Sequence, residues 1–211
     1  DPASPAGRIS DRHLAAAYDD RVALATLATG CAAITTEFEN VPAPSLEYLA
    51  RSVRVRPSAA AVAVCQDRIA EKTFLRDQHL PHGTFAVIRN EQDLATAPPN
   101  VFPGVLKVAR FGYDGKGQAL LRRASDADAA WETLQGRPLL YERFVNFSRE
   151  VSLVAVRDRG GRIACYPLAA NVHEQGILVE TRAPYRHAGL QRAAERHHRR
   201  LMQALGHVGV L

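Results

Sequence analysis

A short glycine-containing stretch between two apolar runs does most to restrict the fold of this chain. The stretch extends from Lys107 to Gln118 and reads Lys-Val-Ala-Arg-Phe-Gly-Tyr-Asp-Gly-Lys-Gly-Gln. The run Val101 to Leu106 precedes it and Ala119 to Leu121 follows it, and apolar runs bounded by Pro and Gly are typical of buried strands. We therefore expect two strands that pair back on each other, with Lys107 on or at the end of the first.

The glycines of this stretch allow two interpretations. Gly112, Gly115 and Gly117 leave backbone N–H groups free to turn inward on an anion, so the loop could hold a phosphate. Asp114-Gly115 is also a favourable hairpin turn, and on its own the stretch favours the hairpin, because short glycine motifs match many unrelated proteins. A Walker loop is excluded because Lys116 is followed by Gly117 and not by Ser or Thr.

Four further segments accompany the loop, and they change its interpretation. They are Glu37 to Pro42, Asp67 to Lys72, Tyr166 to His173, and Gly176 to Leu178. In this order and at these separations, the five motifs resemble the N5-carboxyaminoimidazole ribonucleotide synthetase family of ATP-grasp enzymes, which acts in purine biosynthesis. The resemblance covers nearly the whole chain. It is specific because five motifs agree, whereas the loop alone would suit other ATP-grasp ligases.

The resemblance implies a reaction and its partners. In that family ATP phosphorylates bicarbonate, the carboxyphosphate delivers CO2, and the amine of 5-aminoimidazole ribonucleotide is carboxylated, leaving ADP and phosphate. Mg2+ is the implied cofactor, and its carboxylate and asparagine ligands are expected beyond Leu211, so none of these residues is assigned to a metal. Two alternatives stay open: a non-catalytic nucleotide-binding or regulatory module with a degenerate ATP-grasp fold, and another ATP-grasp carboxylate–amine ligase.

The resemblance also implies site residues. Lys107 and Lys116 would act in catalysis by neutralising phosphate charge as it develops. Glu37, Tyr113 and Asp114 would lie on the side of the aminoimidazole ribonucleotide. The implied nucleotide-side residues lie in the glycine loop, beside it, and in segments before and after it: Arg68, Lys107, Gly112, Tyr113, Asp114, Gly115, Lys116, Gly117, Gln118, Glu142, Arg143, Phe144, Val145, Glu150 and His173.

Two cations at helical spacing carry information independent of the resemblance. Arg68 and Lys72 stand at i and i+4 of a predicted helix, Asp67 to Gln78, where like charges repel each other. A bound triphosphate or a neighbouring acidic side chain would neutralise these two positive charges. For Arg68, the alternative to a nucleotide contact is a surface ion pair with Glu71.

Two glutamates on predicted strands suggest a purine pocket. Glu142 could accept from an adenine amino group, the backbone of Phe144 and Val145 could read the ring edge, and Glu150 could take the ribose hydroxyls. A carboxylate among apolar strands usually has a partner, because an unpaired buried charge is costly. Arg143 or Arg149 is the alternative partner.

The expected architecture combines α/β and α+β parts of an ATP-grasp fold. Residues 1–58 are predicted to be the remainder of an N-terminal α/β domain with a parallel sheet, including strands at 13–18 and 31–38. Residues 59–142 form a small lobe with the glycine-rich loop, and residues 143–211 the first part of a large lobe. The first residues look like a cut edge, because the family's glycine-rich strand–loop–helix does not precede Asp1. Glu37 would emerge at the carboxyl end of a strand, where ligands gather, or be a solvated loop carboxylate.

Composition limits the other functional classes. The net charge of +5 comes largely from arginine, and its densest cluster, Arg192 to Arg200, has no interleaved aromatic residues, so we expect no nucleic-acid partner. Three separated cysteines without ligand spacing are interpreted as buried free thiols of a cytoplasmic protein.

No apolar run reaches the ~18 residues of a membrane helix. His173 has no second histidine at ligand spacing, which disfavours metal ligation. A homodimer is an assembly that the resemblance allows.

Overall fold

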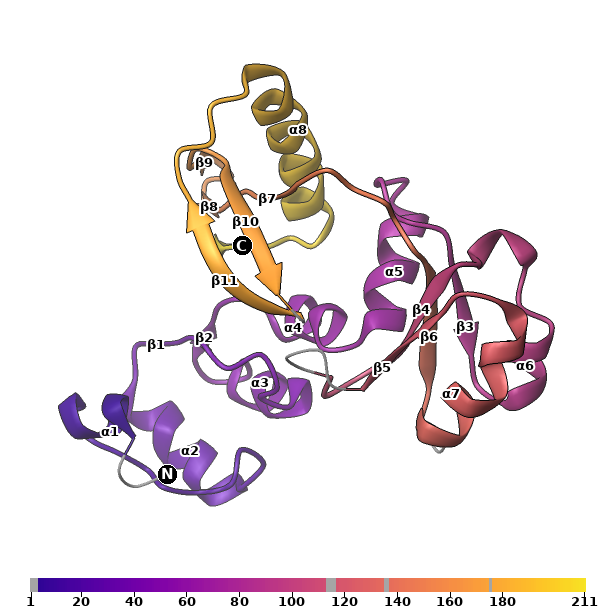
Figure 1. Ribbon diagram of the computed structural model, residues 1–211. Helices are drawn as coiled ribbons and strands as arrows, with labels where there is room; N and C mark the ends of the chain where they lie inside the picture. The colour runs from indigo at the N-terminus through magenta and orange to yellow at the C-terminus, as the bar shows by residue number, and fades with distance from the viewer. Residues whose placement is uncertain (1–3, 113–116, 135–136, 175) are drawn as a thin grey trace. The chain divides into compact units, whose positions relative to one another are not determined.

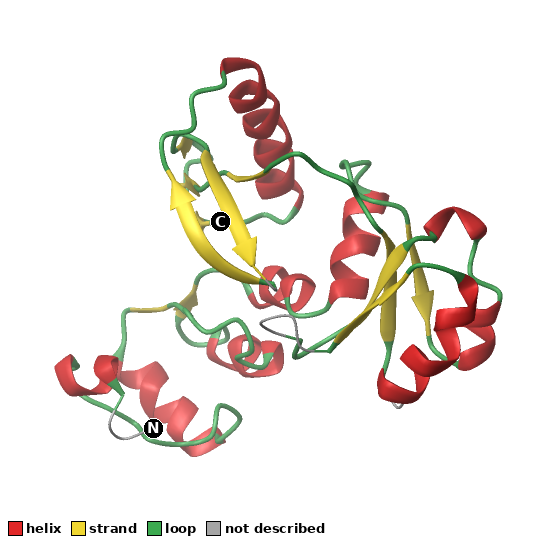
Figure 2. Ribbon diagram, in the orientation of Figure 1, coloured by secondary structure: helices red, strands yellow, loops and turns green. Residues whose placement is uncertain are grey.

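The computed structural model describes residues 4–112, 117–134, 137–174 and 176–211, and its elements are labelled in Figure 1. The chain divides into two compact units, Asp1–Ala63 and Val64–Leu211. Each unit combines helices with short strands, as the colouring of Figure 2 shows. The expectation of mixed α/β and α+β architecture is confirmed. The predicted domain limits, after residues 58 and 142, stay predictions.

The N-terminal unit is built on a small parallel pairing. Its elements are α1 (Pro5–Ile9), α2 (Arg21–Gly30), β1 (Ala33–Ile34), α3 (Ala43–Leu49), β2 (Arg54–Val55) and most of α4 (Ala59–Cys65). Strands β1 and β2 pair in parallel, as expected. Helix α2 begins where the Asp20 carboxylate accepts hydrogen bonds from the N–H groups of Val22 and Ala23. The core gathers apolar side chains from helices and strand: Leu24, Leu46, Leu49, Val55, Ala59 and Val62.

Two strand predictions in this unit were wrong: one predicted strand is absent, and the other is much shorter than predicted. Residues 13–18 form no strand, and the predicted strand 31–38 is reduced to Ala33–Ile34. Three of the residues from 13 to 18 are alanines, which fit a pleated surface poorly, and most of the segment is exposed. An apolar run without an adjacent ladder partner therefore stays irregular.

The second unit begins with a four-stranded antiparallel sheet and its helices. The strands are β3 (Phe85–Ile88), β6 (Leu139–Arg143), β4 (Gly104–Val108) and β5 (Gln118–Leu121), in that order across the sheet. Helices α6 (Glu91–Ala95) and α7 (Ala127–Leu134) pack on one face, and α5 (Arg68–Asp77) lies against the other (Figure 1). Short 3-10 turns at Pro99–Val101 and Ala124–Asp126 complete this part.

Strand alternation decides which side chains meet α5. Leu106 and Val108 of β4 are almost fully buried in the core under α6 and α7, so Lys107 between them points to the opposite face. On β6, Tyr141 joins the same core, and Glu142 therefore shares the face of Lys107. The predicted pairing of the two apolar runs around the glycine loop is confirmed, with Lys107 opposite Gln118.

The rest of the second unit contains two three-stranded sheets and one long helix. One sheet has the order β11 (Ile177–Arg182), β10 (Ala169–Glu174), β7 (Glu150–Ser152). The other has the order β12 (Gly209–Val210), β8 (Ala155–Arg157), β9 (Ile163–Cys165). Helix α8 (Ala188–Ala204) carries the arginine cluster and buries Met202.

Two global features complete the description. Among the described residues, no helix has both the length and the apolar character needed to cross a membrane. The expectation of buried cysteines was wrong, because Cys31 and Cys165 are only half-buried and Cys65 is exposed.

Candidate functional site

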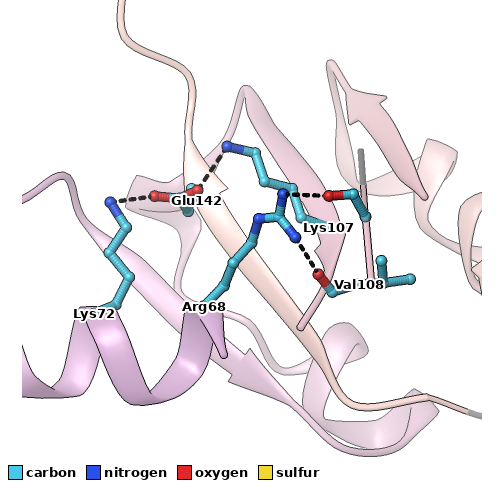
Figure 3. A network of polar contacts seen from close by, with 6 residues as sticks. Arg68, Lys72, Lys107, Val108 and Glu142 are labelled. Carbon is cyan, nitrogen blue, oxygen red and sulfur yellow. Dashed lines mark hydrogen bonds and ion pairs between the residues drawn. The ribbon is translucent and has the colours of Figure 1, made fainter. Parts of the chain in front are cut away.

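A half-buried carboxylate with two lysine partners lies between α5 and the antiparallel sheet. Glu142 Oε1 is 2.7 Å from Lys72 Nζ, and Glu142 Oε2 is 2.7 Å from Lys107 Nζ (Figure 3). The carboxylate is 13% exposed, and the two lysines are 20% and 29% exposed. Three elements, α5, β4 and β6, thus bring charged groups to one point. We call these three residues the Glu142 cluster.

The electrostatics of the cluster keep the carboxylate ionised. Burial raises the pKa of Glu142, but the hydrogen bonds and charges of Lys107 and Lys72 together outweigh burial and hold this pKa below its ordinary value. A negative charge beside two cations is favoured over its neutral form. The cluster therefore presents two ammonium groups with one carboxylate between them.

Arg68 lies beside the cluster and holds the start of the glycine loop. Its guanidinium donates to the carbonyl oxygens of Val108 at 3.1 Å and Gly112 at 3.2 Å, and its main-chain N–H donates to Ala109. Figure 3 shows its side chain next to Lys107. Asp67 fixes the helix start by accepting from two backbone N–H groups. The alternative ion pair with Glu71 is not among the contacts of the described residues; backbone carbonyls take its place.

The two ends of the glycine loop are closed by the strands. The Val108 N–H donates to the Gly117 carbonyl at 2.8 Å, and Gln118 opens β5. Gly117 has a φ of +72°, a conformation that side chains disfavour. Tyr113, Asp114, Gly115 and Lys116, which the sequence predicts to meet substrate and phosphate, lie outside the described residues.

Replacing Gly117 tests how strictly the loop base is built. In Gly117→Ala the new methyl group would stand 2.6 Å from Val108 Cγ2, and Val108 is packed in the core. We expect a loss of about 2–3 kcal/mol in the free energy of unfolding, because backbone strain and overpacking add. Denaturant unfolding of the purified variant measures this loss. The matched control is Gly83→Ala, where a methyl group meets nothing within 4 Å; equal stability of the two variants would contradict the prediction.

The chain leaves β6 with a free donor–acceptor pair. The Arg143 N–H donates to Thr84 and the Phe144 N–H donates to Pro103. Within the described part of the chain, the Phe144 carbonyl and the Val145 N–H make no hydrogen bond. Arg143, Phe144 and Val145 are exposed, and this acceptor and donor belong to one trans peptide unit, so they point to opposite sides of the chain.

Glu150 and His173 are brought together by strand register. Asn171 of β10 pairs with Glu150 of β7, and His173, two residues further on, has its Nδ1 atom 2.8 Å from Glu150 Oε2. Neither Glu142 nor Glu150 pairs with the arginines considered as alternative partners: Arg149 lies over the Tyr185 ring instead. No group of three His, Cys, Asp or Glu side chains that could hold a metal occurs among the described residues.

Glu37 belongs to the other unit and is described there alone. It is exposed after β1 and lines a cavity of about 320 Å³ whose walls are mainly apolar, from Tyr18, Leu24 and other side chains. The cluster, Arg68 and the loop ends, by contrast, all belong to the second unit. The structure therefore brings most of the predicted nucleotide-side residues into one unit and leaves Glu37 as a separate prediction.

Lys72 is the residue of this site that the sequence-based assignment left out. Its spacing from Arg68 indicated its role, because two cations at i and i+4 repel each other unless anionic or acceptor groups lie beside them. In the structure these partners come from the chain itself: Lys72 pairs with Glu142, and Arg68 donates to backbone carbonyls. The spacing predicted a partner without identifying it.

The fold and these contacts define an ATP-grasp protein. The family model described as ATP-grasp domain matches residues 73–211, and the one described as ribonucleotide synthetase preATP-grasp domain matches residues 1–66. The N5-carboxyaminoimidazole ribonucleotide synthase of Brucella melitensis is 40% identical over 98% of this chain and 58% of its own length. The chain belongs to the N5-carboxyaminoimidazole ribonucleotide synthase family within the ATP-grasp proteins.

Solved structures agree with this assignment. The N5-carboxyaminoimidazole ribonucleotide synthetase of Thermus thermophilus superposes with a TM-score of 0.85 at 41% identity, over 92% of this chain and 53% of that one. The Aspergillus clavatus enzyme, solved in complex with ADP and 5-aminoimidazole ribonucleotide, gives 0.88 at 26% identity, over 99% and 56%. The chain thus spans little more than half the length of these relatives.

Proposed function

We propose that the protein containing this chain carboxylates 5-aminoimidazole ribonucleotide with bicarbonate and ATP. The observation that carries the proposal is the Glu142 cluster at the base of the glycine loop, in a chain whose relatives bear this activity in their names. Bicarbonate oxygen would attack the γ-phosphorus of ATP, releasing ADP. Carboxyphosphate would then lose phosphate to give CO2, and the amine nitrogen would bond to that carbon while losing a proton.

Lys107 is the residue with the most direct role in this proposal. Its ammonium group lies on the sheet face beside the loop end, where a triphosphate held by backbone N–H groups would bring negative charge. A fixed cation stabilises charge that develops on a transferring phosphoryl group. Lys116, outside the described residues, is proposed to act from the loop on the same charge.

The adenine ring is proposed to bind where the chain leaves β6. The unpaired Val145 N–H can donate to a ring nitrogen of adenine, while the Phe144 carbonyl of the same peptide unit points the opposite way. Each carboxylate oxygen of Glu142 has a further lone pair beyond its lysine contact, so it can accept from the amino group of adenine. Glu150, oriented by His173, is proposed to accept from the ribose hydroxyls.

Fewer observations support the assignments for the second substrate and the metal. Glu37, Tyr113 and Asp114 are proposed to face 5-aminoimidazole ribonucleotide, the ligand named with the Aspergillus enzyme. Mg2+ does not fit the described residues, among which no acidic cluster could hold it, so no step here depends on a metal held by this chain. A cytoplasmic location and a homodimer stay predictions.

Reconstituted turnover tests the proposal. The full-length protein is expected to release phosphate from ATP only when bicarbonate and 5-aminoimidazole ribonucleotide are both present. Omission of each component in turn is the control. A protein that binds ATP without this turnover would support the alternative, a non-catalytic module, and turnover with a different amine would support another ATP-grasp ligase.

A further inference from the structure

The Glu142 cluster contains one cation, Lys72, to which the reaction above gives no role. Each lysine takes one oxygen of the carboxylate: Lys72 takes Oε1 and Lys107 takes Oε2, both at 2.7 Å (Figure 3). Formally, two positive groups and one negative group leave one positive charge over. The cluster can therefore release one lysine without leaving the carboxylate unpaired.

The choice of lysine at both positions is unusual for this chain. It holds 27 lysines and arginines, and only three of them are lysines, namely Lys72, Lys107 and Lys116. An arginine fork tends to bind both oxygens of a carboxylate, whereas an ammonium group contacts one as a compact charge. Lysine at position 72 thus leaves the second oxygen open to Lys107.

Because Glu142 is largely buried, it needs Lys72 as a counter-ion once Lys107 has moved away. Glu142 is 13% exposed, and a carboxylate that loses its partner at such a depth becomes costly to keep ionised. If Lys107 turned toward a triphosphate, Glu142 would retain only Lys72. Lys72 is fixed on α5, the helix whose first residue, Arg68, is bonded to the end of β4 and to the loop.

We propose that Lys72 is a positioning residue that keeps Glu142 ionised and in place, so that Lys107 can move from Glu142 to the nucleotide phosphates. This deepens the proposed function and rests on its nucleotide site. The exchange is favoured electrostatically, because a triphosphate carries more negative charge than one carboxylate. Lys72 and Glu142 then remain as a neutral pair under the adenine end of the nucleotide.

Loss of Lys72 should weaken ATP binding in the full-length protein. In Lys72→Met, Lys107 becomes the only counter-ion of Glu142, and we expect the ATP dissociation constant to rise about 5- to 20-fold. Lys72→Arg keeps a cation beside Glu142 and should bind ATP more tightly than Lys72→Met, although its fork can take both carboxylate oxygens. Arg76→Met, one helical turn beyond Lys72, removes an exposed cation that pairs with Asp77 and not with Glu142; it is the matched control and should bind as wild type does. Isothermal calorimetry measures all four proteins, with a thermal melt of each to verify folding.

The pH dependence of that binding provides a readout that a merely structural role would not change. The charged groups that face Glu142 are Lys107 from β4 and Lys72 from α5, while β3 presents the uncharged Phe85 opposite it. Removing Lys72 removes one cause of the lowered pKa of Glu142, so its carboxylate protonates at a higher pH. The pH at which ATP affinity changes should therefore be higher in Lys72→Met than in wild type or Lys72→Arg.

A double-mutant cycle decides whether Lys72 acts through Glu142. If it does, adding Lys72→Met to Glu142→Gln should cost less than about twofold further in ATP affinity, because neighbours in one network are not additive. Additive losses, or wild-type affinity of Lys72→Met, would overturn the inference. Because these are binding measurements, a protein that binds ATP but carboxylates nothing refutes the proposed reaction, while the cycle still supports or overturns the role of Lys72.

Discussion

In the full-length protein, Lys107→Met is expected to slow ATP-dependent phosphate release by roughly 30- to 150-fold, because a charge-assisted hydrogen bond is worth on the order of 2–3 kcal/mol. Methionine nearly preserves the length and apolar stem of lysine while removing its charge. The measurement is phosphate release with saturating bicarbonate and 5-aminoimidazole ribonucleotide. Phosphate release should slow because the phosphates would lose the cation that neutralises their charge during transfer.

Folding should suffer much less than turnover in this variant. Glu142 keeps Lys72 at 2.7 Å, so its carboxylate is not left without a partner. A thermal melt beside the kinetic assay separates the two effects. Wild-type turnover by a folded Lys107→Met protein would refute the role of Lys107 at the phosphates, and a collapsed melt would show that Lys107 is structural.

Local pattern was sufficient to predict the framework around the loop. The apolar runs on either side of Lys107 to Gln118 do form paired strands, because alternation with period two places Leu106 and Val108 in a core and Lys107 on the other face. Helix α5 spans Arg68–Asp77, within the predicted helix Asp67 to Gln78. Both features depend on residues close together in the sequence.

Contacts between distant residues could not be derived in the same way. Lys107 and Glu142 are separated by 35 positions, and they meet only because β4 lies between β6 and β5 with one particular register. A shift of one residue would have turned Glu142 into the core. The sequence therefore predicted that Glu142 needs a partner, and proposed Arg143 or Arg149, whereas the register supplies two lysines.

Arg68 poses a question that one pair of substitutions answers. The resemblance implies that this arginine contacts the nucleotide, whereas the structure shows two of its N–H groups on the carbonyls of Val108 and Gly112. A nucleotide contact depends mainly on positive charge. A loop anchor depends on the fork of the guanidinium, which a lysine cannot reproduce.

We expect Arg68→Lys to be almost as impaired as Arg68→Met, because the shorter lysine side chain has one nitrogen in place of the two that reach the carbonyls on β4 and in the loop. Loss of both bonds should cost about 2–3 kcal/mol after allowance for partial exposure, and should raise the KM for ATP by roughly 30-fold or more as the loop loses its anchor. Thermal melts and ATP titrations of both variants measure this, with Arg76→Met as the control on the same helix. Near-wild-type behaviour of Arg68→Lys beside an impaired Arg68→Met would contradict the anchor and return Arg68 to a charge contact with the nucleotide.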